Sequence, residues 1–271
     1  MQQGTFLIDI AADICRKHFP GKDEHVLDTV LDKVVQDMTG EEGTGVWSNM
    51  ESVRLHVAAP TLSTAHFFRI ASAYRGQRET VHKKFSFPPQ KLSISDKSAF
   101  VEKLRLAVYT ACLAAFIQGV NVIDAANKEN KWNIDYGAVW QIWRAGCIIQ
   151  ADYISDNILG PVFHKATELD DLNLITKSDK ALDGLKDGYH KLKDVLAECY
   201  KSDLVVPALS ATAEWIKIIS GTDLPTAFYE AQLDYFGKHM YDSKTDKDVS
   251  GPTEGKHHFE WKPTSQAAKG I

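Results

Sequence analysis

The segment from Asp96 to Asn127 constrains the fold of this chain more than any other. Ser95 and Asp96 are typical helix-capping residues, and the residues that follow are apolar on nearly every side of a helix. A helix of that kind must be covered by other elements on most of its surface. Gly119 and several alanines favour the close approach of a second helix. We therefore expect a buried central helix.

Apolar residues recur at helical spacing in most of the remaining chain. The polar segment 75–93 has no sustained period and is expected to be a loop. No alternation typical of a strand persists over four residues, so the fold class is all-α. We expect a helical domain over residues 1–241 and an extended polar tail over 242–271. The predicted helices are Thr5–Lys17, Asp23–Thr39, Trp47–Ala58, Thr61–Tyr74, Tyr136–Arg144, Cys147–Ile158, Leu182–Lys201, Val206–Ser220 and Pro225–Lys238.

Charge and composition narrow the class of protein. The net charge is −5, and no cluster of Lys and Arg is interleaved with aromatic residues, which argues against a nucleic-acid partner. The most apolar window, Val108–Ile123, contains Gln118 and Asn121 and is shorter than the ~18 residues that span a bilayer. The N-terminus lacks a basic region and a continuous apolar stretch, so we expect no signal peptide. Four widely spaced cysteines favour reduced thiols. We expect a cytoplasmic protein without a membrane partner.

The stretch from Gly40 to Arg69 holds the first candidate site. Glycine in a helix costs about 1 kcal/mol per residue, so the glycines around Thr44 predict a turn rather than a helix. Such a turn offers backbone N–H groups and one hydroxyl to an anion. Arg69 follows on a helical segment. The guanidinium of an arginine can bind a carboxylate or a phosphate through two parallel hydrogen bonds. The alternative interpretations are that the glycines around Thr44 form only a tight corner and that Arg69 is a half-exposed cation. The local sequence does not decide between these and a ligand site.

Two further groups of residues stand out. His239 lies just beyond a predicted helix end after Gly237, where a histidine caps the helix more often than it binds a ligand. The segment 140–149 carries two tryptophans and a glycine, which favours core packing at a corner. The histidines show no metal-ligand spacing, and the glycine order around Gly43 is not that of a dinucleotide fingerprint. We expect no metal-binding, cofactor-binding or catalytic residues in this chain.

These groups, in this order, resemble the C-terminal domain of 6-phosphogluconate dehydrogenase. The resemblance covers nearly the whole chain, from about Phe6 to Trp261. The matching residues are Phe6–Ile10, Gly43-Thr44-Gly45 with Trp47, Arg69, Trp143-Arg144, Gly146-Cys147-Ile148-Ile149, Asp234-Tyr235-Phe236-Gly237, His239, and His258-Phe259 with Trp261.

The resemblance implies a function. The family oxidises 6-phosphogluconate, a sugar-acid phosphate, with NADP and then releases carbon dioxide to give ribulose 5-phosphate in the pentose phosphate pathway. Its subunits join a Rossmann domain to a large helical domain and pair as homodimers. By resemblance, Thr44 and Arg69 hold the substrate phosphate, and His239 reaches the active site of the partner subunit. The family's dinucleotide fold and acid/base residues lie upstream of Met1, so we expect this chain to be inactive alone.

Two departures from the family pattern bear on phosphate binding. Glu42 stands where the family has lysine, and Leu233 stands where it has arginine. A glutamate beside a phosphate repels it by about 4 kcal/mol at ~4 Å and an effective dielectric near 20. The residues after Lys262 also lack the family's glycine-rich tail. Two alternatives therefore remain open: a helical dimerisation or regulatory module without catalysis, or a relative that acts on an unphosphorylated sugar acid.

Overall fold

The computed structural model describes residues 5–34, 43–86, 91–144, 146–163, 177–247, 251 and 254–261. Within these ranges the regular elements are helices, and the β pairings are two isolated bridges, His18–His25 and Tyr241–His257. The prediction of an all-α fold is confirmed. The chain forms two compact units, Met1–Ile216 and Lys217–Ile271. The sequence placed its boundary at residue 241 instead, and that boundary stays a prediction.

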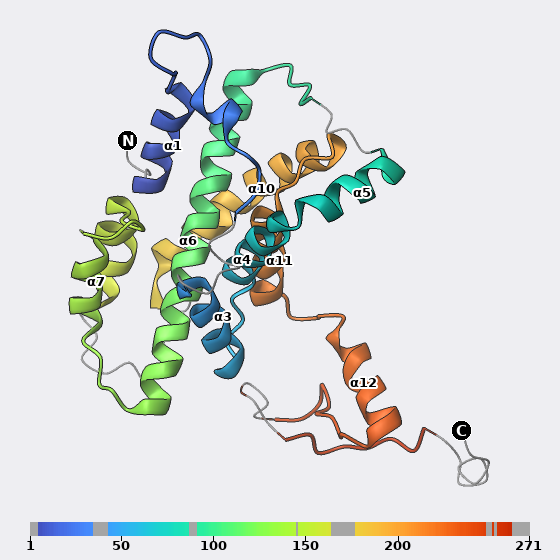
Figure 1. Ribbon diagram of the computed structural model, residues 1–271. Coiled ribbons are helices and arrows are strands. Elements are labelled where there is room, and N and C mark those ends of the chain that lie inside the picture. The colour runs from blue at the N-terminus through green and yellow to red at the C-terminus, as the bar shows by residue number, and fades with distance from the viewer. Residues whose placement is uncertain are drawn as a thin grey trace. The chain divides into compact units, whose positions relative to one another are not determined.

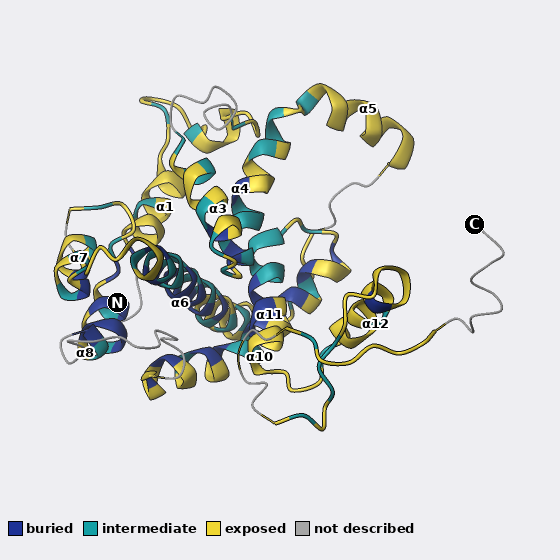
Figure 2. Ribbon diagram, turned by 90° about the horizontal axis from the view of Figure 1, so that it is seen from below, coloured by how far each residue is buried: buried dark blue, intermediate teal, exposed yellow. Residues whose placement is uncertain are grey.

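Helix α6, Lys97–Asn130, is the central helix of the N-terminal unit, as the sequence predicted. Its cap is Asp96, whose carboxylate accepts a hydrogen bond from the Ala99 N–H at 2.9 Å. In two views at right angles, α7 (Tyr136–Arg144) lies on one side of α6 and α3 (Thr44–Arg54) and α4 (Pro60–Ala73) lie on the other (Figures 1 and 2). The buried residues of α6 lie between Ala107 and Ala126, and their burial explains the apolar character of this part of the helix.

Length and composition alone would allow α6 to cross a membrane, and it is the one helix in the described ranges that meets this test. The sequence analysis took the apolar window Val108–Ile123 to be shorter than a membrane span, and this is wrong because an 18-residue window of α6 meets the test. Half of its most apolar window is buried inside the structure. Burial of this kind is what a core helix requires, so its hydrophobicity is explained by packing.

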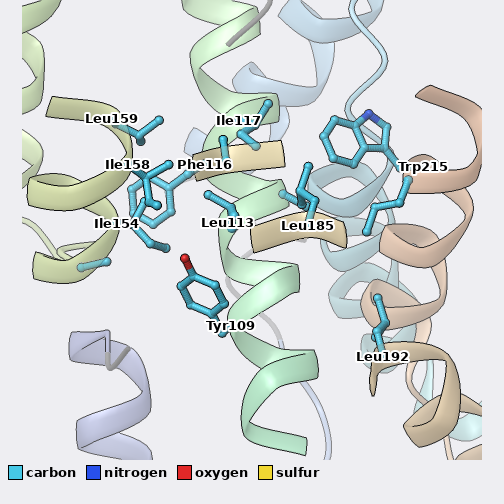
Figure 3. Packing of buried hydrophobic residues seen from close by; sticks show 14 of the residues in the cluster. Tyr109, Leu113, Phe116, Ile117, Ile154, Ile158, Leu159, Leu185, Leu192 and Trp215 are labelled. Carbon is cyan, nitrogen blue, oxygen red and sulfur yellow. The ribbon is translucent and has the colours of Figure 1, made fainter. Parts of the chain in front are cut away.

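Helix α10, Asp179–Lys201, packs closely along α6. At the closest approach, a Cβ added to Gly188 would lie 1.6 Å from the Thr110 Oγ1, so only glycine fits there. Leu185 lies on one side of Leu113, and the segment that carries Ile154 lies on the other (Figure 3). A second helix therefore approaches the central one closely, as predicted, but at Gly188 of α10. At Gly119, which suggested the approach, a Cβ would meet only the Trp143 side chain, at 3.9 Å.

A buried polar contact joins α4, α6 and α11 (Pro207–Ser220). The Gln118 side chain, fully buried on α6, accepts a hydrogen bond from the Thr61 N–H at 3.0 Å and donates one to the Thr61 Oγ1 at 2.9 Å. The Thr61 hydroxyl also lies 3.0 Å from the Thr212 hydroxyl. This contact fixes the first turn of α4. The predicted site residue Arg69 lies further along the same helix.

The predicted helix Asp23–Thr39 is wrong over its described part. After α1 (Phe6–Arg16), residues 23–34 form only a short 3₁₀ helix, η1, at Val26–Thr29. Val30 and Leu31, which the periodicity placed on a buried face, are 62% and 55% exposed. Contacts with α1 cover Val26 only in part, and with Val30 and Leu31 exposed, a β-branched sequence gains too little from burial to form a longer helix. Residues 35–39 lie outside the described ranges.

The predicted loop at 75–93 is wrong over residues 75–85, which form helix α5, Arg75–Phe85. Its apolar residues are too few to create a periodic pattern. Charged side chains support it instead: Arg75 pairs with Glu79 at 3.0 Å, and Arg78 pairs with Asp32 at 2.9 Å. A helix that is polar all round depends on such pairs, and hydrophobic periodicity does not detect it.

The predicted helix Cys147–Ile158 begins later and is irregular. Residues 148–149 form a turn, and a π-helix, η2, spans Ile154–Leu159 before α8, Gly160–Phe163. The Ser155 carbonyl accepts hydrogen bonds from the Gly160 N–H and from the Trp140 indole N–H, the latter at 3.0 Å. A Cβ at Gly160 would lie 2.8 Å from the Ser155 oxygen, so glycine permits the wide turn.

The C-terminal unit contains helix α12, Thr226–Gly237, which ends at Lys238 in the left-handed conformation. Beyond α12, the Tyr241 N–H donates to the His257 carbonyl at 2.8 Å, and the His257 N–H donates back at 2.9 Å. This pairing folds the segment 254–261 back onto the residues that follow α12. The predicted polar tail is thus partly ordered by contacts within its own unit.

Candidate functional site

The N-terminal end of α3 forms the first part of the candidate site. Gly43 precedes the helix, and its carbonyl accepts a hydrogen bond from the Trp47 N–H at 2.8 Å. The Trp47 indole covers Gly43 so closely that a Cβ there would lie 3.3 Å from its Nε1. The Thr44 side chain is exposed. N–H groups in the first turn of a helix have no partner within it, so an exposed hydroxyl at this end favours an anion.

The sequence predicted a turn at Gly43–Gly45, but Thr44 and Gly45 form the first turn of α3. A Cβ on Gly45 would lie 2.7 Å from the buried His66 Nδ1, so α3 and α4 touch at this point. The Gly45 carbonyl also accepts a hydrogen bond from the Asn49 Nδ2 at 2.6 Å. Glycine is therefore present for close packing, and the backbone freedom that suggested a turn is not used.

Arg69 lies one helical turn after His66 on α4. Residues three apart share a helix face, so Arg69 lies on the α4 face that meets α3. Its side chain is exposed, and its carbonyl accepts a hydrogen bond from the Ser72 Oγ at 2.6 Å. Thr44 and Arg69 thus come from two helices that touch at Gly45 and His66. Their arrangement provides a hydroxyl, a helix N-terminus and a guanidinium on one unit.

In the C-terminal unit, the completely buried Asp234 carboxylate joins two stretches that the sequence treated separately. Its Oδ1 accepts hydrogen bonds from the Met240 N–H at 3.1 Å and the His258 Nδ1 at 2.9 Å. Its Oδ2 accepts from the Phe259 N–H at 3.1 Å and the Trp261 Nε1–H at 2.8 Å. One carboxylate therefore holds the loop after α12 and the chain segment near its end.

These hydrogen bonds decide the ionisation of Asp234. Burial alone raises the pKa of the carboxyl, but the four donors from His258, Trp261, Phe259 and Met240 outweigh it and hold the pKa well below its usual value. The carboxylate is charged at neutral pH and saturated by donors. It is a structural anion, with no capacity left for a ligand.

His239 lies in the loop that Asp234 organises. Its side chain is exposed, and its ring lies edge-on to Phe236 with centroids 6.1 Å apart. Leu233, one residue before Asp234 on α12, is 38% exposed. An apolar side chain therefore occupies the position where the resemblance expects an arginine. Glu42, the other departure, lies outside the described residues.

The core packing predicted at the corner 140–149 is confirmed for its two tryptophans but is wrong for Ile148 and Ile149, which are 66% and 38% exposed. Trp140 is 5% exposed in the hydrophobic core, and Trp143 packs against that core. Arg144 pairs with Asp156 at 2.7 Å, and Gly146 adopts a φ of +92° at the turn. Among the described residues, no three His, Cys, Asp or Glu side chains gather as metal ligands.

Residues 1–261 match the family model for the 6-phosphogluconate dehydrogenase C-terminal domain. The chain belongs to this family. The resemblance that the separate motifs suggested is confirmed, and it extends over the helices and over the C-terminal segment that Asp234 anchors.

Curated relatives give the same family. The chain is 41% identical to a decarboxylating 6-phosphogluconate dehydrogenase of Emericella nidulans and covers 55% of that protein with 96% of its own residues. It is 30% identical to an NADP(+)-dependent enzyme of Bacillus subtilis and covers 51% of it with 95% of its own residues. The 6-phosphogluconate dehydrogenase structure of Plasmodium falciparum has the same fold, with a TM-score of 0.82, 24% identity, and coverage of 96% of this chain and 52% of that one. The chain spans about half the length of these relatives.

Sequence reasoning named Thr44, Arg69 and His239 but missed Asp234 as the residue that organises the C-terminal unit. The signal was present: an acidic residue within an aromatic segment, followed by two isolated aromatic residues, Phe259 and Trp261. Their hydrogen bonds to Asp234 depend on tertiary structure, which spacing alone does not reveal.

Proposed function

We propose that this chain is the helical domain of an NADP-dependent, decarboxylating 6-phosphogluconate dehydrogenase. The enzyme oxidises 6-phosphogluconate and releases carbon dioxide to form ribulose 5-phosphate. The observation that carries the proposal is the junction of α3 and α4, where Thr44 and Arg69 are presented by two touching helices of a member of this family.

Each site residue has a physical role in the proposal. The Thr44 hydroxyl and the N-terminal N–H groups of α3 donate hydrogen bonds to the substrate phosphate. The Arg69 guanidinium adds charge-assisted hydrogen bonds, which are the stronger kind. His239 contacts the substrate in the active site of a partner subunit. The family resemblance supports these assignments, and the exposure of all three side chains is consistent with them.

A dinucleotide is bound by a parallel sheet whose first turn is rich in glycine. The described residues contain isolated bridges and no such sheet, so they do not fit NADP, and none is assigned to it. NADP use is proposed because the Bacillus subtilis relative is named for it and the Plasmodium falciparum structure includes it. We expect the 271-residue chain alone to show no turnover, and NADP-dependent turnover by it would contradict this assignment.

Homodimer formation is part of the proposal. Large apolar side chains are exposed on both units. Examples are Trp47 and Val53 on α3 and Phe228 and Phe236 on α12, which are between 65% and 75% exposed. Extensive exposed apolar surface is typical of protein interfaces. Light scattering after size exclusion should give twice the chain mass of 30.2 kDa, and a monomer at all concentrations would contradict the dimer.

A cytoplasmic location is proposed from the four free cysteines.

Thermal unfolding with ligand tests the proposed function. 6-Phosphogluconate should raise the melting temperature of the chain, because a ligand that binds only the folded state stabilises it. Arg69→Ala should abolish the rise, whereas Arg16→Ala, which changes an exposed arginine on α1, should retain it. If the wild-type chain shows no rise, the substrate assignment is wrong.

The presence of Leu233 supports two alternative functions, and the same test distinguishes them. An apolar residue replaces a cation of the family pattern there, which weakens phosphate binding. A rise with gluconate equal to that with 6-phosphogluconate would indicate a relative acting on an unphosphorylated sugar acid. No rise with either ligand would indicate a dimerisation or regulatory module.

A further inference from the structure

The backbone on both sides of His239 is held in an unusual conformation. Lys238 and Met240 have φ values of +50° and +64°, in the left-handed region that residues with a Cβ seldom adopt. Such residues persist where the surrounding structure enforces them. His239 therefore lies between two constrained positions, although it is exposed itself.

Both constraints come from Asp234. Its backbone carbonyl accepts a hydrogen bond from the Lys238 N–H at 3.0 Å, and its carboxylate accepts one from the Met240 N–H at 3.1 Å. The first bond closes the end of α12, and the second turns the chain immediately after His239. Asp234 thus fixes the entry to and the exit from the residue between them.

The segment 254–261 supports the same loop from the other side. A Cβ on Gly255 would lie 2.5 Å from the Met240 carbonyl carbon and the Tyr241 nitrogen, so the two backbones are in direct contact. The Phe259 N–H and the Trp261 indole N–H donate to the Asp234 Oδ2. The loop is therefore held between its own helix and the returning segment.

We propose that Asp234 is a positioning residue that sets the place of His239 and couples it to Trp261. Asp234 is fully buried and all its bonds go to the protein, so it acts through His239 and does not contact substrate. The inference rests on the proposed function for the role of His239 in substrate binding. The constraint on the loop itself is independent of that role.

Asp234→Asn is the direct variant. An amide keeps one acceptor oxygen and presents an NH₂ group on the other side. The NH₂ group should face His258 and Met240, because the His258 ring nitrogen can accept a hydrogen bond whereas the Phe259 and Trp261 N–H groups only donate, so the Met240 bond is lost. Trp261→Phe is a milder variant that keeps an aromatic ring and removes only one donor. Asp223→Asn is the matched control, because Asp223 is an exposed carboxylate of the same unit that pairs with Lys244 at 2.8 Å.

Amide hydrogen exchange and histidine ring NMR signals in the full chain test the constraint without ligand. We expect the Met240 amide to exchange about tenfold faster or more in Asp234→Asn, with a shifted His239 ring signal. Trp261→Phe should move both in the same direction by less, and Asp223→Asn should move neither. Unchanged His239 and Met240 signals in a folded Asp234→Asn or Trp261→Phe chain would overturn the proposal.

Titration with 6-phosphogluconate tests the coupling to binding. Asp234→Asn and His239→Ala should weaken binding by similar factors, and the double variant should be no weaker than His239→Ala alone. Additive losses would overturn the proposal, because they show that Asp234 acts independently of His239. If the wild-type chain does not bind 6-phosphogluconate, the proposed function fails, and the exchange and ring signals alone decide whether Asp234 positions His239.

Discussion

The Trp261 indole N–H donates a hydrogen bond of 2.8 Å to the Asp234 carboxylate, across 27 positions of the chain. This bond joins two of the residue groups that, taken in order along the chain, resemble the 6-phosphogluconate dehydrogenase family. Among the described residues of the C-terminal unit, the Asp234 carboxylate is the one buried side chain, so this unit has a charged group at its centre.

The stability of the C-terminal unit should depend on pH through Asp234. The pKa of this carboxyl is lower in the folded state, so its contribution is complete above the unfolded value of about 3.9 and declines as pH falls below it. The difference in melting temperature between wild type and Asp234→Asn should therefore be constant from pH 5 to 7 and shrink below about pH 4. Differential scanning calorimetry follows the transition. A difference that stays constant down to about pH 2 would contradict this account.

Gly45→Ala should destabilise the junction of α3 and α4. The new Cβ would lie 2.7 Å from the His66 Nδ1, and such overpacking costs about 1–3 kcal/mol. Urea unfolding measures the change in the free energy of unfolding. Gly76→Ala is the control, because nothing lies within 4 Å of a Cβ there, and it should stabilise α5 by up to about 1 kcal/mol. Equal effects of the two variants would show that close packing is not the role of Gly45.

Gln118→Met should destabilise the N-terminal unit although the side-chain volume hardly changes. The variant leaves the buried Thr61 N–H without its acceptor, which costs about 1–3 kcal/mol. The same unfolding measurement applies, with Gln77→Met on the exposed surface of α5 as control. A neutral Gln118→Met would mean that the polar contact adds nothing to the anchoring of α4.

The sequence predicted the helices whose apolar faces are buried and failed where other forces decide. Helix α6 is identifiable because its residues Leu113 and Ile117 reach the core. Helix α5 was missed because ion pairs such as Arg78–Asp32 leave no hydrophobic period. The helix expected at Asp23–Thr39 has the period, but in its described part Val30 and Leu31 remain exposed. Periodicity reports a face that can be buried and does not report whether a partner covers it.

The candidate site shows the same limit. Thr44, Arg69 and His239 were chosen from local motifs and a family resemblance, and their binding roles stay predictions. The contact of Gly45 with His66, which brings α3 against α4, is a tertiary property. The four hydrogen bonds to Asp234 are tertiary as well, so no spacing rule in the sequence could have indicated them.

The central claim is that the junction of α3 and α4 binds the phosphate of 6-phosphogluconate. Calorimetric titration of the chain with 6-phosphogluconate and with gluconate tests it most directly, since the two ligands differ only in the phosphate. A charge-assisted hydrogen bond contributes about 1.5–3 kcal/mol, so 6-phosphogluconate should bind about ten to a hundred times more tightly than gluconate. Arg69→Ala should remove most of this preference. Equal affinity for the two ligands in the wild-type chain would contradict the claim.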